Sequence, residues 1–174
     1  MKETVFVIGG CRSGKSRQAL ETAESYPGNG QIFVATCIPY DDEMRHRVAK
    51  HRRERSQNWQ TLEAPELLPQ AITENSGNAS VLLVDCLTLW INNLLAASGD
   101  TEKIVKKIEK LVQAIEAANC PVVLVSNEVG AGIVPENQLA RQYRDLVGTA
   151  NQAVAAQADR VIWMVAGIPV TVKG

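Results

Sequence analysis

The sequence predicts a three-layer α/β fold with a mainly parallel β-sheet, and three observations support this prediction. Short apolar runs alternate with helix-forming stretches through most of the chain, which is typical of a parallel sheet covered by helices on both faces. A glycine-rich turn over residues 9–16 joins the first apolar run to the first helical stretch. Two apolar runs at the end of the chain, 161–165 and 170–172, are separated by a short turn and predict an antiparallel pair at the sheet edge.

The glycine-rich turn reads GxxxxGKS, the pattern of a phosphate-binding loop. Glycines allow the backbone to turn tightly and bring several N–H groups toward one point, where the following helix N-terminus adds partial positive charge. We expect Lys15 to reach the β- and γ-phosphates of ATP or GTP and the Ser16 hydroxyl to help hold Mg²⁺. The alternative is a chance match in an ordinary strand-to-helix turn. The nucleotide contacts predicted in this loop are Gly9, Gly10, Cys11, Arg12, Ser13, Gly14, Lys15 and Ser16.

Length favours a single domain spanning residues 1–174, and the alternation of strands and helices around the phosphate-binding loop predicts the P-loop NTPase (RecA-like) class. A formal net charge of −1 gives no reason to expect nucleic acid as the main partner. The four cysteines are far apart and form no CxxC pair, so neither a zinc site nor a disulfide framework is indicated. No stretch offers the roughly twenty apolar residues that a membrane helix requires. We therefore expect a cytoplasmic protein with reduced cysteines and no membrane span.

The first half of the chain predicts three strands and three helices. Residues 4–8 are nearly all apolar, as in a central parallel strand. Pro27 and Gly28 form a turn signal that ends the first helix. The acidic run 41–43 can cap the next helix and place negative charge in its first turn, where the helix dipole favours it. The expected strands are 4–8, 32–35 and 59–63, and the expected helices are 17–25, 42–55 and 65–74, the last beginning at Pro65.

The second half continues the same alternation. A stretch from 102 to 118 carries apolar residues on one face at helical spacing, and Thr101 can cap it. Another apolar run, 122–125, reads as a central strand. The expected strands are 81–85, 122–125, 161–165 and 170–172, and the expected helices are 87–97, 102–118 and 137–157.

Acidic and polar residues follow the expected strands at the ends where ligands of open α/β sheets bind. Asp85 ends a buried strand in the Walker B pattern, in which the carboxylate helps hold Mg²⁺ directly or through water. The alternative is that Asp85 caps the helix beginning at Leu87. Asn127 and Glu128 follow a later strand and could orient a water, a metal or a substrate.

The helix expected over 42–55 is unusually basic from Arg45 to Arg55, a stretch that contains six arginines and lysines and a single acid, Glu54. Arg47, His51 and Arg55 fall on one stripe at helical spacing, so two cations would bracket one imidazole. The alternative is a solvated basic helix face with no chemical role.

Four blocks of the sequence together resemble the CobU/CobP family, the bifunctional adenosylcobinamide kinases/adenosylcobinamide-phosphate guanylyltransferases of cobalamin biosynthesis. The resemblance covers essentially the whole chain, and its second and fourth blocks are far more specific than the phosphate loop. The blocks are GGCRSGKS at 9–16, DDEMRHRVAKHRRERSQNWQTLEAP at 41–65, LLVDCLTLWINNLL at 82–95, and the stretch 126–173 that begins SNEVGAGIVPENQLARQYRDL.

The resemblance implies that one site runs two reactions. The first phosphorylates the aminopropanol hydroxyl of adenosylcobinamide with ATP or GTP. The second transfers GMP from GTP to that phosphate through a guanylylated histidine, giving adenosylcobinamide-GDP and pyrophosphate. In the family motif the histidine stands seven positions after the methionine of DDEM, which is His51 here, whereas His46 does not match. A guanylylated imidazole is a good leaving group for the second half-reaction, which agrees with this assignment.

The resemblance also implies the rest of the site and a homo-oligomer, expected to be a trimer, with active sites near subunit boundaries. Independently of the resemblance, Glu63 is chemically suited to bind guanine, because a carboxylate can accept hydrogen bonds from the N1–H and N2–H₂ edge of this base. The alternative is an exposed residue at a strand end. Beyond the loop, the implied nucleotide contacts are Thr36, Cys37, Ile38, Arg52, Arg53, Glu54, Arg55, Glu63 and Asp85, with Ser16 and Asp85 at the metal.

Two other functions stay open at this point. A P-loop small-molecule kinase with one activity would use only the γ-phosphate and leave the basic helix as a phosphate clamp or lid. A RecA-like regulatory module would bind nucleotide and signal through assembly. A chain of this type can also keep one of the two activities and lose the other. No short motif in the sequence marks the pocket for the corrinoid substrate.

Overall fold

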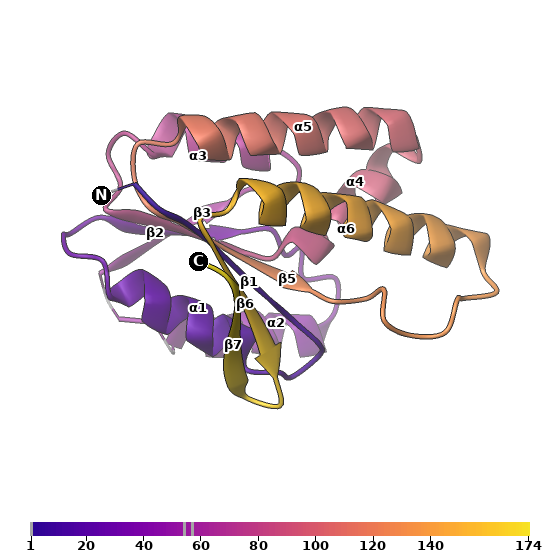
Figure 1. Ribbon diagram of the computed structural model, residues 1–174, viewed down its shortest axis with the longest axis horizontal. Helices are drawn as coiled ribbons and strands as arrows, with labels where there is room; N and C mark the ends of the chain where they lie inside the picture. The colour runs from indigo at the N-terminus through magenta and orange to yellow at the C-terminus, as the bar shows by residue number, and fades with distance from the viewer. Residues whose placement is uncertain (1, 54, 57) are drawn as a thin grey trace.

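All strands of the computed structural model belong to one sheet (Figure 1). The structure describes residues 2–53, 55–56 and 58–174, and of Arg47, Lys50 and His51 it describes the backbone alone. Within these residues the strands are β1 (Thr4–Gly9), β2 (Gln31–Ala35), β3 (Trp59–Glu63), β4 (Val81–Asp85), β5 (Val122–Asn127), β6 (Arg160–Val165) and β7 (Ile168–Lys173).

The strand order across the sheet is β3-β2-β4-β5-β1-β6-β7. Every neighbouring pair is parallel except the last, in which β6 and β7 form an antiparallel hairpin. The predicted mainly parallel sheet with an antiparallel C-terminal edge pair is therefore confirmed.

Helices cover both faces of this sheet. Figure 1 shows α3, α4, α5 and α6 on one side and α1 and α2 on the other. Among the described residues, no helix is both long enough and apolar enough to cross a membrane. The helices are α1 (Lys15–Glu24), α2 (Asp42–Arg53), α3 (Leu68–Asn75), α4 (Leu87–Ser98), α5 (Thr101–Ala117) and α6 (Gln138–Gln157).

The central strands are apolar along their length because both of their faces are buried. Phe6 and Leu124 belong to the core under α3–α6, together with the fully buried Trp90 of α4. Val5 and Val123, their immediate chain neighbours, belong to the core under α1. Successive side chains of a strand point to opposite faces, so each central strand contributes to both cores.

Acidic side chains cap α2 and α5, and the second of these caps corrects the sequence prediction. The Asp41 carboxylate accepts from the Met44 N–H at 2.7 Å at the start of α2, as expected. At the start of α5 the cap is Asp100, which accepts from the Lys103 N–H at 3.1 Å. The expected cap, Thr101, is the first residue inside the helix.

The predicted start of the helix at Pro65 is wrong, because α3 begins at Leu68. The Pro65 carbonyl accepts from the Asn93 side-chain amide at 2.9 Å, and the Glu66 carbonyl accepts from the Trp90 indole N–H at 3.1 Å. These two carbonyls are bound to side chains of α4, so the segment forms a turn against α4 before the helix starts.

Two further expectations are corrected by helix boundaries. The helix α2 ends at Arg53, so Arg55 lies beyond it and does not continue a stripe with Arg47 and His51. The N-cap position of α4 is held by Cys86, which makes no side-chain capping bond. Asp85 therefore does not occupy the cap of α4, and the capping alternative for this carboxylate is wrong.

Candidate active site

The phosphate loop leaves β1 at Gly9 and enters α1 at Lys15. A Cβ atom at Gly9 would lie 2.6 Å from the Ser13 hydroxyl oxygen and 2.7 Å from the Met164 carbonyl oxygen, so only glycine fits. Gly14 forms the N-cap of α1 with φ 89°, in the left-handed region that side chains rarely adopt. The turn is therefore tight enough to direct its N–H groups at a single anion.

Lys15 lies against the loop that it is predicted to serve. Its Nζ donates to the Gly10 carbonyl at 3.2 Å, and the Ser13 N–H donates to the same carbonyl at 3.3 Å. The Ser13 hydroxyl is buried and has no hydrogen-bond partner among the described residues. Buried hydroxyls are normally hydrogen-bonded, so this group is a candidate donor to a phosphate oxygen.

Two segments far apart in the sequence brace the loop. The N–H of Gly167, in the turn between β6 and β7, donates to the Ser13 carbonyl at 3.1 Å. On the other side, the Glu128 N–H donates to the Gly9 carbonyl at 3.1 Å. The loop is thus fixed between the C-terminal hairpin and the end of β5.

Asp85 ends β4 at the same edge of the sheet as the phosphate loop. It is paired with Ala35 of β2 and Val125 of β5, while Gly9 is paired with Asn127 of β5. Parallel strands direct their carboxyl ends to one side, which is where ligands of such sheets bind.

The charges of the Asp85 carboxylate and the Lys15 ammonium both act on the buried thiol of Cys86. Burial raises the pKa of Cys86 to about 11, the Asp85 carboxylate adds to the rise, and the Lys15 ammonium opposes it. Burial also raises the pKa of the Cys37 thiol, again with a contribution from Asp85. Lys15 and Asp85 therefore lie in one electrostatic environment.

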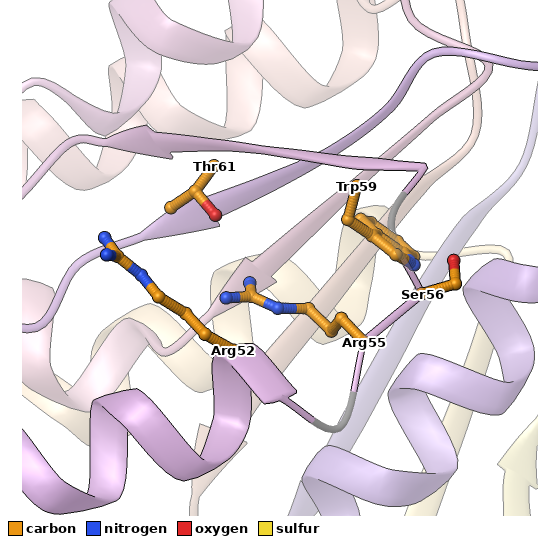
Figure 2. Close-up of a pocket in the computed structure, with 5 residues that line it drawn as sticks. All are labelled: Arg52, Arg55, Ser56, Trp59 and Thr61. Atoms are coloured by element: carbon orange, nitrogen blue, oxygen red, sulfur yellow. The ribbon is translucent and has the colours of Figure 1, made fainter.

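A basic pocket of about 390 Å³ lies between the end of α2 and β3. The Arg55 guanidinium carbon lies 3.6 Å from the centre of the Phe33 ring, a cation–π contact. Burial lowers the pKa of Arg55, the Arg52 charge lowers it further, and Asp85 opposes both. Figure 2 shows both arginines among the residues that line this pocket, which are Arg52, Arg55, Ser56, Trp59 and Thr61.

Comparison with known proteins identifies the family. Residues 5–172 match the family described as cobinamide kinase / cobinamide phosphate guanyltransferase, named CobU. The chain belongs to this family. It is 40% identical to the "Bifunctional adenosylcobalamin biosynthesis protein CobP" of Pseudomonas aeruginosa over 169 residues, covering 97% of this chain and 96% of that protein. It is also 40% identical to the corresponding CobU protein of Salmonella typhimurium over 183 residues, covering 97% and 99%.

The family membership confirms the predicted activities, those of a cobinamide kinase and guanylyltransferase of cobalamin biosynthesis. The fold agrees with a solved structure of a KaiC-like protein from Pyrococcus horikoshii, with a TM-score of 0.50 and 18% identity over 92% of this chain and 70% of that one. At this identity the likeness concerns the fold alone, and it confirms the RecA-like class.

The structure brings much of the predicted CobU-family site to one edge of the sheet. The phosphate loop, Asp85 and the segment 36–38 meet there, and the charge of Arg55 interacts with that of Asp85. Arg52 Nη2 donates to Glu63 Oε1 at 3.2 Å, and both side chains are exposed. Arg53 is exposed at the end of α2. Glu54 lies outside the described residues, as does the side chain of His51, so the roles assigned to these residues stay predictions.

Sequence reasoning missed a buried polar network behind Asp85. Thr88 and Asn93 of α4 and Asn151 of α6 are buried and hydrogen-bonded at the ends of the strands. A signal was present, because Asn93 lies among the apolar residues Ile91, Leu94 and Leu95 of α4, and a buried amide is costly unless it finds partners. The Gly167 contact with the loop carried no comparable signal.

We expect Gly9→Ala to lower the free energy of unfolding by about 1–3 kcal/mol, the usual range for an overpacked site. The added methyl would overlap the Ser13 hydroxyl and the Met164 backbone. Chemical denaturation of Gly9→Ala and of Gly10→Ala measures the effect. Gly10→Ala is the matched control, because a Cβ there meets no atom within 4 Å. Equal unfolding midpoints for the two variants would contradict the close packing of Gly9.

Proposed function

We propose that one nucleotide site at the carboxyl edge of the sheet carries out two transfers on a cobinamide substrate. The γ-phosphoryl group of ATP or GTP passes to the hydroxyl of adenosylcobinamide. GMP then passes from GTP to the resulting adenosylcobinamide phosphate, and pyrophosphate is released. The position of Lys15 on the phosphate loop and of Asp85 at the same edge of the sheet, with Arg55 in the basic pocket, supports this proposal, because both transfers require a triphosphate held along its whole length.

The residues at this edge fit Mg²⁺. Ser16, in the first turn of α1, offers a hydroxyl oxygen, and Asp85, at the end of β4, offers a carboxylate. A hard cation prefers such oxygen donors, and Mg²⁺ held by these two residues would supply positive charge that offsets the charge of the phosphates. Lys15 would neutralise charge at the β- and γ-phosphates in both reactions.

His51 is the proposed nucleophile of the guanylyl transfer, and its backbone lies in the last turn of α2. Its neutral imidazole attacks the α-phosphorus of GTP, a P–N bond forms, and the P–O bond to pyrophosphate breaks. A phosphate oxygen of adenosylcobinamide phosphate then attacks the same phosphorus, the P–N bond breaks, and the imidazole is regenerated. Arg52 and Arg55 would offset the negative charge that passes to pyrophosphate.

Glu63 is the proposed reader of the guanine base. Its carboxylate is 73% exposed in its pair with Arg52, and exposed ion pairs contribute little free energy. The carboxylate can therefore exchange Arg52 for the two N–H donors of guanine, an edge that adenine lacks.

The proposal includes a cytoplasmic location, which the free state of the described cysteines supports.

His51→Asn is expected to abolish the covalent GMP adduct while the kinase product is retained. The substitution removes the nucleophile and leaves the phosphate loop unchanged. Incubation with GTP labelled at the α-phosphorus, followed by denaturation, measures the adduct, and product analysis with adenosylcobinamide measures the kinase. His46→Asn is the matched control and should keep both signals. An acid-labile adduct on His51→Asn would exclude this nucleophile, and no adduct on the wild type would leave a kinase with one activity.

Lys15→Ala is expected to reduce both products by roughly 10²- to 10³-fold, because one preorganised cation serves both transfers. The measurement is product formation from adenosylcobinamide with GTP. Arg17→Ala, two residues further along α1, removes an exposed cation paired with Glu21 and should stay near wild type. Loss of one product alone in Lys15→Ala would argue for two separate nucleotide sites.

The proposal also includes assembly of identical copies, expected to be trimers, through one face of the β6–β7 hairpin. Trp163 is paired with Val170 and Val165 with Ile168, so these side chains share a face. All four are between 42% and 65% exposed, and Val172 continues the row at 62%. An exposed apolar patch on an edge hairpin is typical of a contact surface.

Val170→Lys is expected to shift the protein from oligomer to monomer, because a charge would be buried in the apolar contact. Size-exclusion chromatography with light scattering measures the mass. Val134→Lys is the matched control, since Val134 is 63% exposed on the 128–137 segment and lies outside the hairpin. An unchanged mass for Val170→Lys would show that this face is not the contact.

A further inference from the structure

Thr36, directly after β2, is fully buried at the edge of the site, and each of its polar groups has a partner inside the protein. Its N–H donates to the Asp85 carbonyl at 3.3 Å. Its hydroxyl donates to the Cys86 carbonyl and accepts from the Cys86 N–H, both at 2.8 Å. Its carbonyl accepts from the Asn93 amide at 2.8 Å. The hydroxyl therefore already has both a donor and an acceptor partner before any nucleotide binds.

These hydrogen bonds lie directly after the last residue pair of the ladder between β2 and β4. The register of β2 and β4 runs from Gln31 and Val81 to Ala35 and Asp85, its last pair. One residue further, the Thr36 side chain supplies to Cys86 the acceptor and the donor that another ladder residue would supply. Cys86 is only 6% exposed, and its carbonyl also accepts from the Trp90 N–H at 3.2 Å at the start of α4, so its N–H is the group that depends most on this hydroxyl.

Asn93 fixes the position of Thr36 in turn. Its side-chain amide donates one hydrogen to the Thr36 carbonyl and the other to the Pro65 carbonyl at 2.9 Å. Asn93 is 4% exposed within the apolar helix α4, so both hydrogens are used inside the protein. The segments that follow β2 and β3 are thereby tied to the helix that follows β4.

Cys86 is also held from the side of β5. Its Sγ lies 3.0 Å from the Thr88 hydroxyl, which accepts from the Asn127 side-chain amide at 2.9 Å. The residue immediately after Asp85 is thus bonded directly by Thr36, which follows β2, and is linked through Thr88 to Asn127 of β5. Little freedom is left in the backbone that directs the Asp85 carboxylate.

We propose that Thr36 and Asn93 are positioning residues, which hold the backbone after Asp85 so that its carboxylate meets the Mg²⁺ of the bound nucleotide. This inference rests on the proposed metal role of Asp85 and assigns Thr36 a different role from the nucleotide contact that the family resemblance implies. Residues that orient a metal ligand commonly change metal affinity or activity by roughly 10- to 100-fold when they are replaced.

The test is the affinity for a GTP analogue with a methylene bridge between its α- and β-phosphorus, which cannot form the GMP adduct, measured by calorimetry once with Mg²⁺ and once with EDTA. The ratio of the two dissociation constants gives the gain in nucleotide affinity that Mg²⁺ causes. In Thr36→Val, which keeps the shape and removes the hydroxyl, we expect this gain to fall roughly 10- to 100-fold while metal-free binding persists. Thr36→Ser should restore most of the gain because it returns the hydroxyl. Asn93→Leu, of similar size and suited to an apolar helix, should lower the gain in the same direction.

Thr22→Val is the matched control, because Thr22 is also buried and its hydroxyl donates to the Gln18 carbonyl at 2.8 Å inside α1. Its gain from Mg²⁺ should equal that of the wild type. An unchanged gain in Thr36→Val would overturn the proposal, and so would equal loss of binding in Mg²⁺ and EDTA, which marks a purely structural residue. Absence of any gain in the wild type would remove the metal role of Asp85, whereas an absent GMP adduct would refute the guanylyl transfer alone.

Discussion

The parallel register of four central strands is the constraint on which the rest of the structure depends. Ala35 is paired with Asp85, Asp85 with Val125, and Asn127 with Gly9, so the strands end together at one edge. A slip of one residue would turn every side chain of a strand to the opposite face, so that side chains packed in one core would enter the other and the packing of both cores would be lost. The two packed cores therefore fix how the phosphate loop and the Asp85 carboxylate lie relative to each other.

Elements outside this register complete the site by bracing its loops. The Gly167 N–H holds the phosphate loop from the C-terminal hairpin, and the Thr36 hydroxyl holds the residue after Asp85. Such bonds reduce the reorganisation needed when a charged ligand arrives, which is how preorganised sites stabilise developing charge. The hairpin that we propose as the contact between copies is also the one that touches the phosphate loop, so assembly and nucleotide binding would share an element.

Much of the fold could be predicted because its strands are apolar runs and its first loop has a distinctive motif. One error was local, because Asp100, the residue before Thr101, supplies the cap of α5. Another occurred where side chains of a different element bind backbone groups, since the helix expected at Pro65 starts at Leu68 and α4 binds the intervening carbonyls. Local propensity does not include such partners, since they come from distant parts of the sequence.

The sequence by itself determined the phosphate loop, the alternation of strands and helices, and the family, because these depend on residue types at short spacing. Only the tertiary structure decided that Arg55 leaves the helical stripe and lies on Phe33, that Glu63 pairs with Arg52, and that the polar groups of Thr36 have partners inside the protein. Hydrogen bonds and cation–π contacts act over a few ångströms between residues that are far apart in the sequence. They exist only once the sheet has brought those residues together.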